Sequence, residues 1–181
     1  MFGLAAKWKW RRPDPLARLA NSIEAVGERD RKLVDESARV DRLRTEGAVA
    51  LYAVCRRFVD ALNGRLSEPA LLLDPTEYSA GYYHDGGPNL FQINLRGRLL
   101  QIEFTATEEL YSTEEFRHPY VLQGAIRSFN QELLDRNTLD EQAIFYCPKD
   151  GAAHWYYFDR RTRGAGLVTP DFFAAQMQRL I

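Results

Sequence analysis

The feature that most constrains the fold is one uninterrupted helical pattern, which runs from Pro15 to Leu62. Asp14 can cap its start, and Pro15 suits the first helical position, where a missing N–H group costs nothing. As a single helix this segment would span roughly 70 Å at about 1.5 Å per residue, which exceeds the diameter of a compact domain of this chain length. The segment must therefore bend or extend beyond the domain. Gly27 and Gly47 are the expected break points, because each costs about 1 kcal/mol relative to alanine.

The first part of the pattern, residues 15–47, is typical of a charged helical arm. Its apolar residues recur three and four positions apart and then thin out among charges: Leu16, Leu19, Ile23, Val26, Leu33, Val40 and Leu43. Glu28 with Lys32, and Asp35 with Arg39, are acid-before-base pairs that each stabilise a helix by about 0.2–0.5 kcal/mol. The incomplete heptad seam predicts that the arm pairs with a second copy, so that the chain forms a homodimer.

From Ala48 onward the apolar pattern changes face and becomes continuous. Its members are Leu51, Val54, Cys55, Phe58 and Leu62, before Asn63 and Gly64 end the helix. This pattern predicts packing against a sheet. We therefore expect an α+β domain at residues 48–181, preceded by the arm and by a basic aromatic segment at residues 1–14.

Alternating apolar residues predict two β-hairpins. In the first, three residues on each side of a two-residue turn at Arg96-Gly97 face the same way: Phe91, Ile93 and Leu95, then Leu100, Ile102 and Phe104. The second hairpin joins residues 143–147 to residues 153–158 around Asp150-Gly151, and Pro148 predicts an exposed edge there. The aromatic run from Tyr78 to Tyr83 predicts a further strand before the first hairpin.

Two more helices are predicted. Ser112 to Glu115 matches a capping box, and an apolar pattern at helical spacing follows it: Leu122, Ile126, Phe129 and Leu133. Thr169 and Pro170 fit the cap and first position of a final helix whose apolar face contains Phe173, Met177 and Leu180.

These elements predict an α+β fold with an antiparallel sheet of about five strands, in the order α-βββ-α-ββ-α. In element order alone, this is similar to small dimeric secretion-chaperone-like domains. That resemblance implies a domain that binds unfolded segments of client proteins, although a long helical arm is a departure from it.

Composition narrows the function classes. The net charge of −1 gives no overall attraction to nucleic acid or to a membrane. Any such contact is expected only through the N-terminal residues Lys7, Trp8, Lys9, Trp10, Arg11 and Arg12. Two cysteines are too few for a secreted disulfide scaffold, and the N-terminus has no apolar stretch of signal-peptide length, so we expect a cytoplasmic protein with reduced thiols.

The first hairpin offers a candidate binding surface on its polar face. The residues between the apolar ones are Gln92, Asn94, Gln101, Glu103 and Thr105. Carboxamides, a carboxylate and a hydroxyl held on rigid strands can bind a ligand or a protein segment. The alternative is a sheet face that is simply solvated.

Catalysis has only weak candidates. A two-residue turn at Asp150-Gly151 would place Cys147 opposite His154, and a cysteine nucleophile needs such a neighbouring base. A buried cysteine beside a strand histidine is the alternative interpretation. A cleft near His84, Glu103 and His154 would support a second function, a small-molecule-binding or hydrolytic domain.

The sequence also contains candidate residues for a metal site and for an anion site. His84 with Asp85, His118 and His154 are ligand types without ligand spacing, so no metal and no cofactor are predicted. Arg160, Arg161 and Arg163 lie beside glycines ahead of the last helix, where cations and backbone amides can bind an anion. A solvated turn is the alternative for these arginines.

The function expected from these patterns is that of a protein-protein interaction module without enzymatic activity. The helical arm would join two copies, and the polar sheet face or an exposed strand edge would receive a segment of a partner protein.

Overall fold

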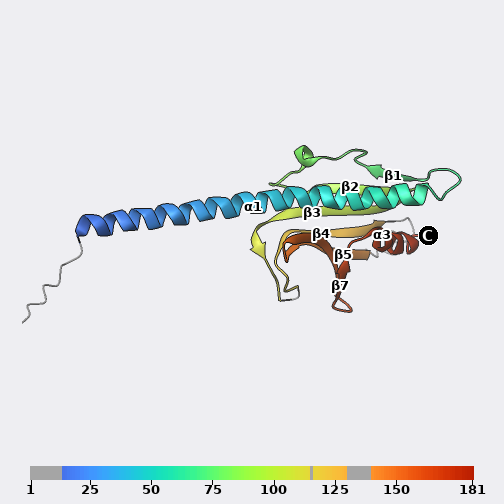
Figure 1. The fold of residues 1–181 in the computed structure, drawn as a ribbon. Coiled ribbons are helices and arrows are strands. Elements are labelled where there is room, and N and C mark those ends of the chain that lie inside the picture. The colour runs from blue at the N-terminus through green and yellow to red at the C-terminus, as the bar shows by residue number, and fades with distance from the viewer. Residues whose placement is uncertain (1–13, 115, 130–139) are drawn as a thin grey trace, which may run out of the picture. The chain divides into compact units, whose positions relative to one another are not determined.

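The computed structural model describes residues 14–114, 116–129 and 140–181 (Figure 1). It confirms an α+β fold with a long N-terminal helix, α1 (Pro15–Asn63), a short C-terminal helix, α3 (Pro170–Gln178), and an antiparallel sheet. The described sheet has seven strands, more than the five expected: β1 (Leu71–Asp74), β2 (Asn89–Leu95), β3 (Arg98–Tyr111), β4 (Tyr120–Phe129), β5 (Asp140–Lys149), β6 (Ala152–Asp159) and β7 (Gly164–Leu167). Strand order in the sheet follows chain order, so the sheet is a simple meander.

Neither predicted break occurs in α1, which contains Gly27 and Gly47 without interruption. Gly47 is required for close packing instead. A Cβ atom there would lie 2.6 Å from Cδ1 of Tyr146 and 2.7 Å from Cδ1 of Leu122. The indole Nε1 of Trp155 also donates a hydrogen bond of 2.7 Å to the Gly47 carbonyl. The lack of a side chain therefore lets the helix approach the sheet, and this contact outweighs the helix-propensity cost of about 1 kcal/mol.

The chain divides into two compact units, one up to Arg39 and one from Val40 to Ile181. Arg44 belongs to the second unit and is buried within it. The Arg44 guanidinium donates to the carbonyls of Thr107 and Glu108 and forms an ion pair of 3.4 Å with Asp85. These contacts tie α1 to the end of β3 and to the loop before β2.

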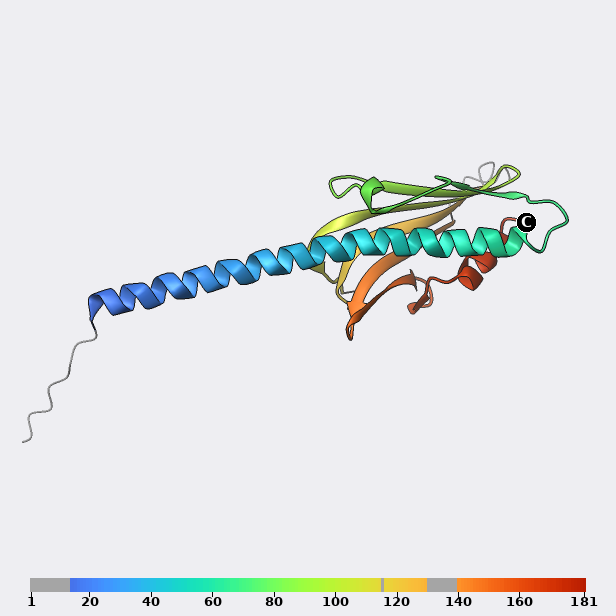
Figure 2. The ribbon, with the colours of Figure 1, turned by 45° about the horizontal axis from the view of Figure 1, so that its top comes forward.

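The core of the second unit lies between one face of the sheet and the two helices (Figure 2). The predicted first hairpin is confirmed with its register: Ile93 pairs with Leu100, and Phe91 pairs with Ile102. Positive φ angles at Arg96 (50°) and Gly97 (89°) form its two-residue turn. The sheet packs on α1 through Leu51, Cys55 and Phe58, and on α3 through Phe172, Phe173 and Met177.

The predicted middle helix is wrong across residues 120–129, which form β4 and pair with both β3 and β5. Leu122 and Ile126 are four residues apart, a spacing that places them on one face of a strand as well as of a helix. Gly124 allows β4 to lie close to β3, because a Cβ atom there would lie 2.7 Å from Cβ of Phe104. Leu133 and Glu115, which supported the predicted helix, lie outside the described residues.

The segment before β4 is a turn in place of a capped helix start. Thr113 Oγ1 accepts a hydrogen bond of 3.0 Å from the Phe116 amide, and the Thr113 amide donates to the Phe116 carbonyl at 3.0 Å. The order α-βββ-α-ββ-α is therefore wrong where its middle helix covers β4. The resemblance to secretion-chaperone-like domains loses its basis with that order.

The second predicted hairpin is confirmed, with Asp150 (φ 50°) and Gly151 (φ 82°) in its turn. It does not supply the exposed edge that Pro148 suggested, since β5 also pairs with β4 and β6 also pairs with β7. Pro148 lies beyond the last residue of β5 that pairs with β4, Tyr146, so its missing N–H group removes no hydrogen bond from that ladder. The edges of the described sheet are β1 and β7, each four residues long.

Two smaller predictions have opposite outcomes. The final helix is confirmed, because Thr169 Oγ1 accepts a hydrogen bond of 3.2 Å from the Phe172 amide and Pro170 opens the helix. The strand predicted at residues 78–83 is wrong. That segment contains a short 3₁₀ helix, η1 (Ala80–Tyr82), and the Tyr78 ring packs edge-on against Phe91 with ring centroids 4.8 Å apart.

Candidate functional site

One face of the sheet carries α1 and α3, and the residues that alternate with the core point to the opposite face. All five residues predicted as a binding surface lie on that opposite face. We use the name polar sheet face for a set of seven residues from four neighbouring strands: Gln92, Asn94, Gln101, Glu103, Thr105, Arg127 and Glu141. Five of these are partly buried, and Asn94 and Glu141 are exposed.

Three charged residues at the centre of the polar sheet face form an ion triad across β3, β4 and β5. Arg127 Nη1 lies 2.9 Å from Glu103 Oε2, and Arg127 Nε lies 2.8 Å from Glu141 Oε2. The hydrogen bond to Glu141, with a further one to Glu103, raises the pKa of the Arg127 guanidinium above its ordinary value. The triad carries a net charge of about −1 at neutral pH. It therefore favours a cationic group in any ligand or partner segment.

Sequence reasoning missed Arg127 and Glu141. The apolar pattern from Leu122 to Leu133 predicts a helix, which takes Arg127 out of the sheet, and the strand of the second hairpin is predicted to start at Ala143. The signal that could have found Arg127 is the alternation in β4 of polar Gln123 and Arg127 with apolar Leu122 and Ile126, which is typical of a half-exposed strand.

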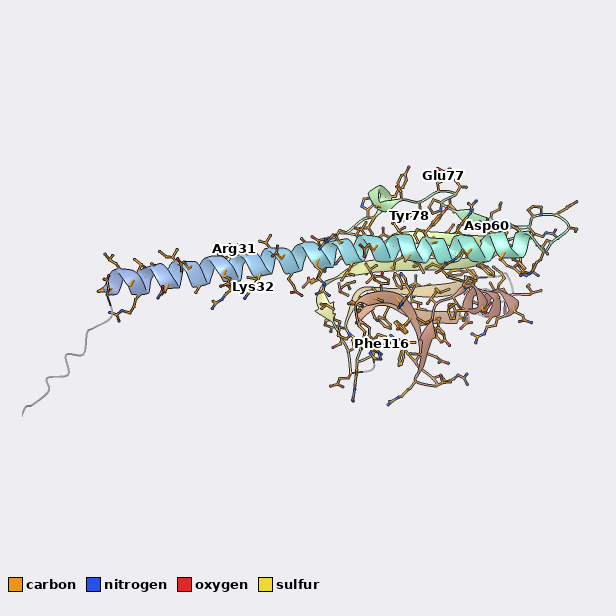
Figure 3. The ribbon with its side chains drawn as sticks, viewed as in Figure 1. Arg31, Lys32, Asp60, Glu77, Tyr78 and Phe116 are labelled. Atoms are coloured by element: carbon orange, nitrogen blue, oxygen red, sulfur yellow. The ribbon has the colours of Figure 1, made fainter. Side chains whose placement is uncertain are left out.

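A second, smaller core lies beside the polar sheet face, formed by Phe116, Tyr120, Cys147 and Phe158, with Phe145 and Tyr156 packed on it. We call it the aromatic cluster; Phe116, labelled in Figure 3, stacks on Phe145 with ring centroids 4.4 Å apart. The Tyr120 and Phe145 centroids are 4.6 Å apart. The segment before β4 thus covers the β5–β6 end of this sheet face.

The aromatic cluster explains the state of Cys147. Its Cα is paired with that of His154, as the turn length predicted. However, Cys147 is buried, and loss of solvation raises its pKa to about 12. A thiol with that pKa is protonated at neutral pH and is a poor nucleophile. His154 is exposed, so the pairing in the register does not produce an activated cysteine.

The proposed catalytic cleft is not assembled either. Glu103 on β3 and His154 on β6 are three strand spacings apart, about 14 Å at about 4.8 Å per spacing. His84 is exposed in the loop before β2, where its amide donates to Asn89 Oδ1 at 2.9 Å. Within residues 14–114, 116–129 and 140–181, no three His, Cys, Asp or Glu side chains come together as a group that could hold a metal ion.

The three arginines proposed as an anion site do not converge. Arg160 and Arg161 line a surface cleft of about 280 Å³, whereas Arg163 lies outside it, in the β6–β7 turn with φ 55°. The cleft also contains the carboxylates of Asp140, Glu141 and Asp159. Residues 164–167 form strand β7 instead of leading directly into the last helix. Carboxylates thus balance the cations of this cleft.

A wider and shallower cleft of about 700 Å³ lies between α1 and the segment after β1. Tyr52 Oη donates to the Thr76 carbonyl at 2.6 Å, and Arg56 Nη1 donates to the same oxygen at 3.1 Å. Figure 3 labels Glu77 and Tyr78, which also line this cleft. The buried hydroxyl of Tyr78 has no hydrogen-bond partner, and burial raises its pKa to about 12.

The unit that ends at Arg39 presents a different kind of surface. In its described part, residues 14–39, the large aliphatic side chains are exposed, from 54% for Val26 to 74% for Leu16. We define the aliphatic stripe as the members that follow the seam: Leu16, Leu19, Ile23, Val26 and Leu33. The predicted pair of Glu28 and Lys32 is present at 3.7 Å. No helix in the described parts of the chain is both long enough and apolar enough to cross a bilayer.

Comparisons of the chain with protein-family models, with curated proteins and with solved structures found no match.

Proposed function

We propose that this chain is a protein-protein interaction module without enzymatic activity. The aliphatic stripe of α1 associates with the stripe of a second copy, and the polar sheet face receives a cationic segment of a partner protein. The observation that carries the proposal is the exposure of the stripe, where five large aliphatic side chains are each more than half exposed.

The energetics of such a helix support association. A helix in water gains most of its stability from the packing of an apolar face, and full burial of one large aliphatic side chain contributes about 1.5–3 kcal/mol. Within residues 14–39 the stripe has no core beneath it, as every residue there except Gly27 is exposed. A second copy offers a complementary surface with the same heptad spacing.

The polar sheet face supports the second half of the proposal. Its hydrogen-bonding groups are held on strands that pair on both sides, so their positions are fixed before a partner binds. The excess carboxylate of the ion triad favours a lysine or arginine in the bound segment. No observation favours the alternative cleft near His84, Glu103 and His154, since neither of the two clefts described above contains any of the three.

The first part of the proposal, self-association through the aliphatic stripe, is tested by light scattering coupled to size exclusion on the full chain. We expect a dimer at micromolar concentration that Leu19→Glu converts into a folded monomer. Ala25→Glu is the matched control, because Ala25 lies off the stripe, and it should leave the dimer intact. A full chain that is monomeric at micromolar concentration would contradict the proposal.

The second part of the proposal, binding of a cationic segment by the polar sheet face, is tested with peptides. A library of short peptides, screened against the intact protein, should enrich sequences with lysine or arginine. Reversal of the charge excess by Glu103→Lys should abolish their binding, whereas the off-face variant Glu28→Lys should retain it. Enrichment of acidic or purely apolar peptides would contradict a cation-selective face.

A further inference from the structure

We infer that the two copies of α1 pack antiparallel, in a register centred on residue 28, so that Asp30 of each copy lies beside Arg29 of the other. This inference rests on the proposed self-association through the aliphatic stripe and specifies its geometry. It follows from the positions of the charged residues relative to the seam.

The seam follows two heptad positions along the N-terminal half of α1. Leu19, Val26 and Leu33 occupy one of them, and Leu16, Ile23, Asp30 and Ser37 occupy the other. Asp30 is therefore a carboxylate at a position that otherwise faces the partner helix. Whatever lies opposite Asp30 decides the arrangement.

A parallel, in-register pair would place identical residues opposite each other. Asp30 would then face Asp30 across the seam, and two carboxylates at that distance cannot both remain ionised without a large penalty. Arg29 would flank Val34 of the other copy, because flanking positions in a parallel pair lie five residues apart. The parallel arrangement therefore puts two like charges in one layer of the seam.

An antiparallel pair brings the two kinds of seam position together. In the register centred on residue 28, Ile23 faces Leu33, Asp30 faces Val26, and Ser37 faces Leu19, so every one of these layers keeps an aliphatic side chain. Arg29 flanks the seam next to Asp30 of the other copy. The two Arg29 and two Asp30 side chains thus form a neutral group at the centre.

The structure of the single chain is consistent with this use of Arg29 and Asp30. Glu28, next to Arg29 in the chain, already has a partner on its own helix, Lys32. Among the described residues, neither Arg29 nor Asp30 has an ion pair or a side-chain hydrogen bond. Gly27, next to the centre, has nothing within 4 Å of a Cβ position, so a second helix can approach closely there.

Cysteine crosslinking tests the orientation in the full chain. Both natural cysteines are buried, so new surface cysteines can be oxidised selectively. We expect a mixture of Leu19→Cys chains and Ser37→Cys chains to form a disulfide at least about tenfold faster than either variant alone, since a disulfide needs Cα atoms within about 7 Å. Ala25→Cys mixed with Ser37→Cys is the control and should not crosslink.

Each outcome has a separate meaning. Rapid crosslinking of Leu19→Cys with itself would establish a parallel pair and overturn this inference while leaving the proposed dimer. A dimer that crosslinks in none of these mixtures would place the interface elsewhere and would also overturn it. A monomer in light scattering would remove the proposed function itself.

A charge-exchange cycle tests the central group independently. Arg29→Asp alone and Asp30→Arg alone should each raise the dimer dissociation constant by about tenfold or more, because each puts four like charges at the centre. The double variant Arg29→Asp/Asp30→Arg should return to within about threefold of the original value, as it restores neutrality. A double variant as weak as the weaker single one would contradict contact between Arg29 and Asp30.

Discussion

The two halves of α1 have one helical pattern and opposite surroundings. Residues 15–39 expose their aliphatic side chains, and Leu19 is 57% accessible. Residues 40–63 bury theirs, with Leu51 and Cys55 fully inaccessible and Phe58 at 3%. The difference lies in the completeness of the apolar pattern: the second half covers a sheet within its own chain, whereas the seam of the first half is interrupted by Asp30 and Ser37. A polar residue within such a seam specifies the register of association at a cost in stability.

The largest expected effect is the difference in unfolding free energy between two truncations, one in each half of α1. Phe58→Ala should lower the free energy of unfolding by about 3–5 kcal/mol, because Phe58 is buried and stacks on Phe173. Leu19→Ala should leave the unfolding of the isolated monomer nearly unchanged and weaken only self-association. Urea unfolding at two protein concentrations separates the two effects. Equal losses in both variants at low concentration would erase the contrast between the halves.

The two glycines of α1 allow a matched comparison. Gly47→Ala should destabilise the fold by about 1–3 kcal/mol, since the new Cβ would meet Tyr146 and Leu122. In the monomer, at a concentration below that of self-association, Gly27→Ala should stabilise the helix by up to about 1 kcal/mol, because nothing in the single chain lies near that position. Thermal unfolding followed by circular dichroism measures both changes. A stabilising Gly47→Ala would show that the helix does not need its close approach to the sheet.

Alkaline titration sharpens the contrast through Cys55, in the buried half of the helix. Burial raises the pKa of the Cys55 thiol far above its ordinary value of 9.0. The unfolded chain therefore loses this proton first, and stability should fall as the pH rises above about 9, by about 1.4 kcal/mol per pH unit for one proton. Cys55→Ala should reduce the slope of the unfolding free energy against pH by the contribution of one proton, as measured by urea unfolding between pH 9 and 10.5. An unchanged slope would indicate that Cys55 is solvated.

The smallest effect is expected on the polar sheet face. Arg127→Met should cost about 1 kcal/mol or less, because the triad is partly solvated, with 28% of the Arg127 side chain accessible. Gln123→Met, on the same strand, is the control. Chemical unfolding at low and high salt measures the difference, which should shrink as salt screens the ion pairs. A loss of several kcal/mol would make Arg127 a structural residue instead of a binding one.

Local signals predicted most of the elements that the structure confirms. Positive-φ turns at Arg96-Gly97 and Asp150-Gly151 set both hairpins, and Thr169 with Pro170 set the last helix. These features depend on residues that are close in sequence. The register of Cys147 with His154 followed from turn length for the same reason.

The missed features depend on tertiary contacts. Residues 120–129 have a spacing compatible with either helix or strand, and pairing with β3 and β5 decides between them. β1 and β7 have only four residues each, too few for a visible period. Arg127 belongs to the candidate site only because residues 120–129 form a strand. The continuous path of α1 through Gly47 likewise depends on Tyr146, which lies far along the chain.

The meander has a kinetic consequence. Because each strand pairs with its neighbour in the chain, the sheet can grow one hairpin at a time, with short loops to close at most steps. The hydrogen bond from Trp155 to Gly47 joins residues 108 positions apart, so it closes one of the longest loops in the fold. Docking of the helix onto the assembled sheet is therefore expected to be the slow event in refolding. The fluorescence of Trp155 would report it, in a variant whose other two tryptophans, Trp8 and Trp10, are replaced by phenylalanine.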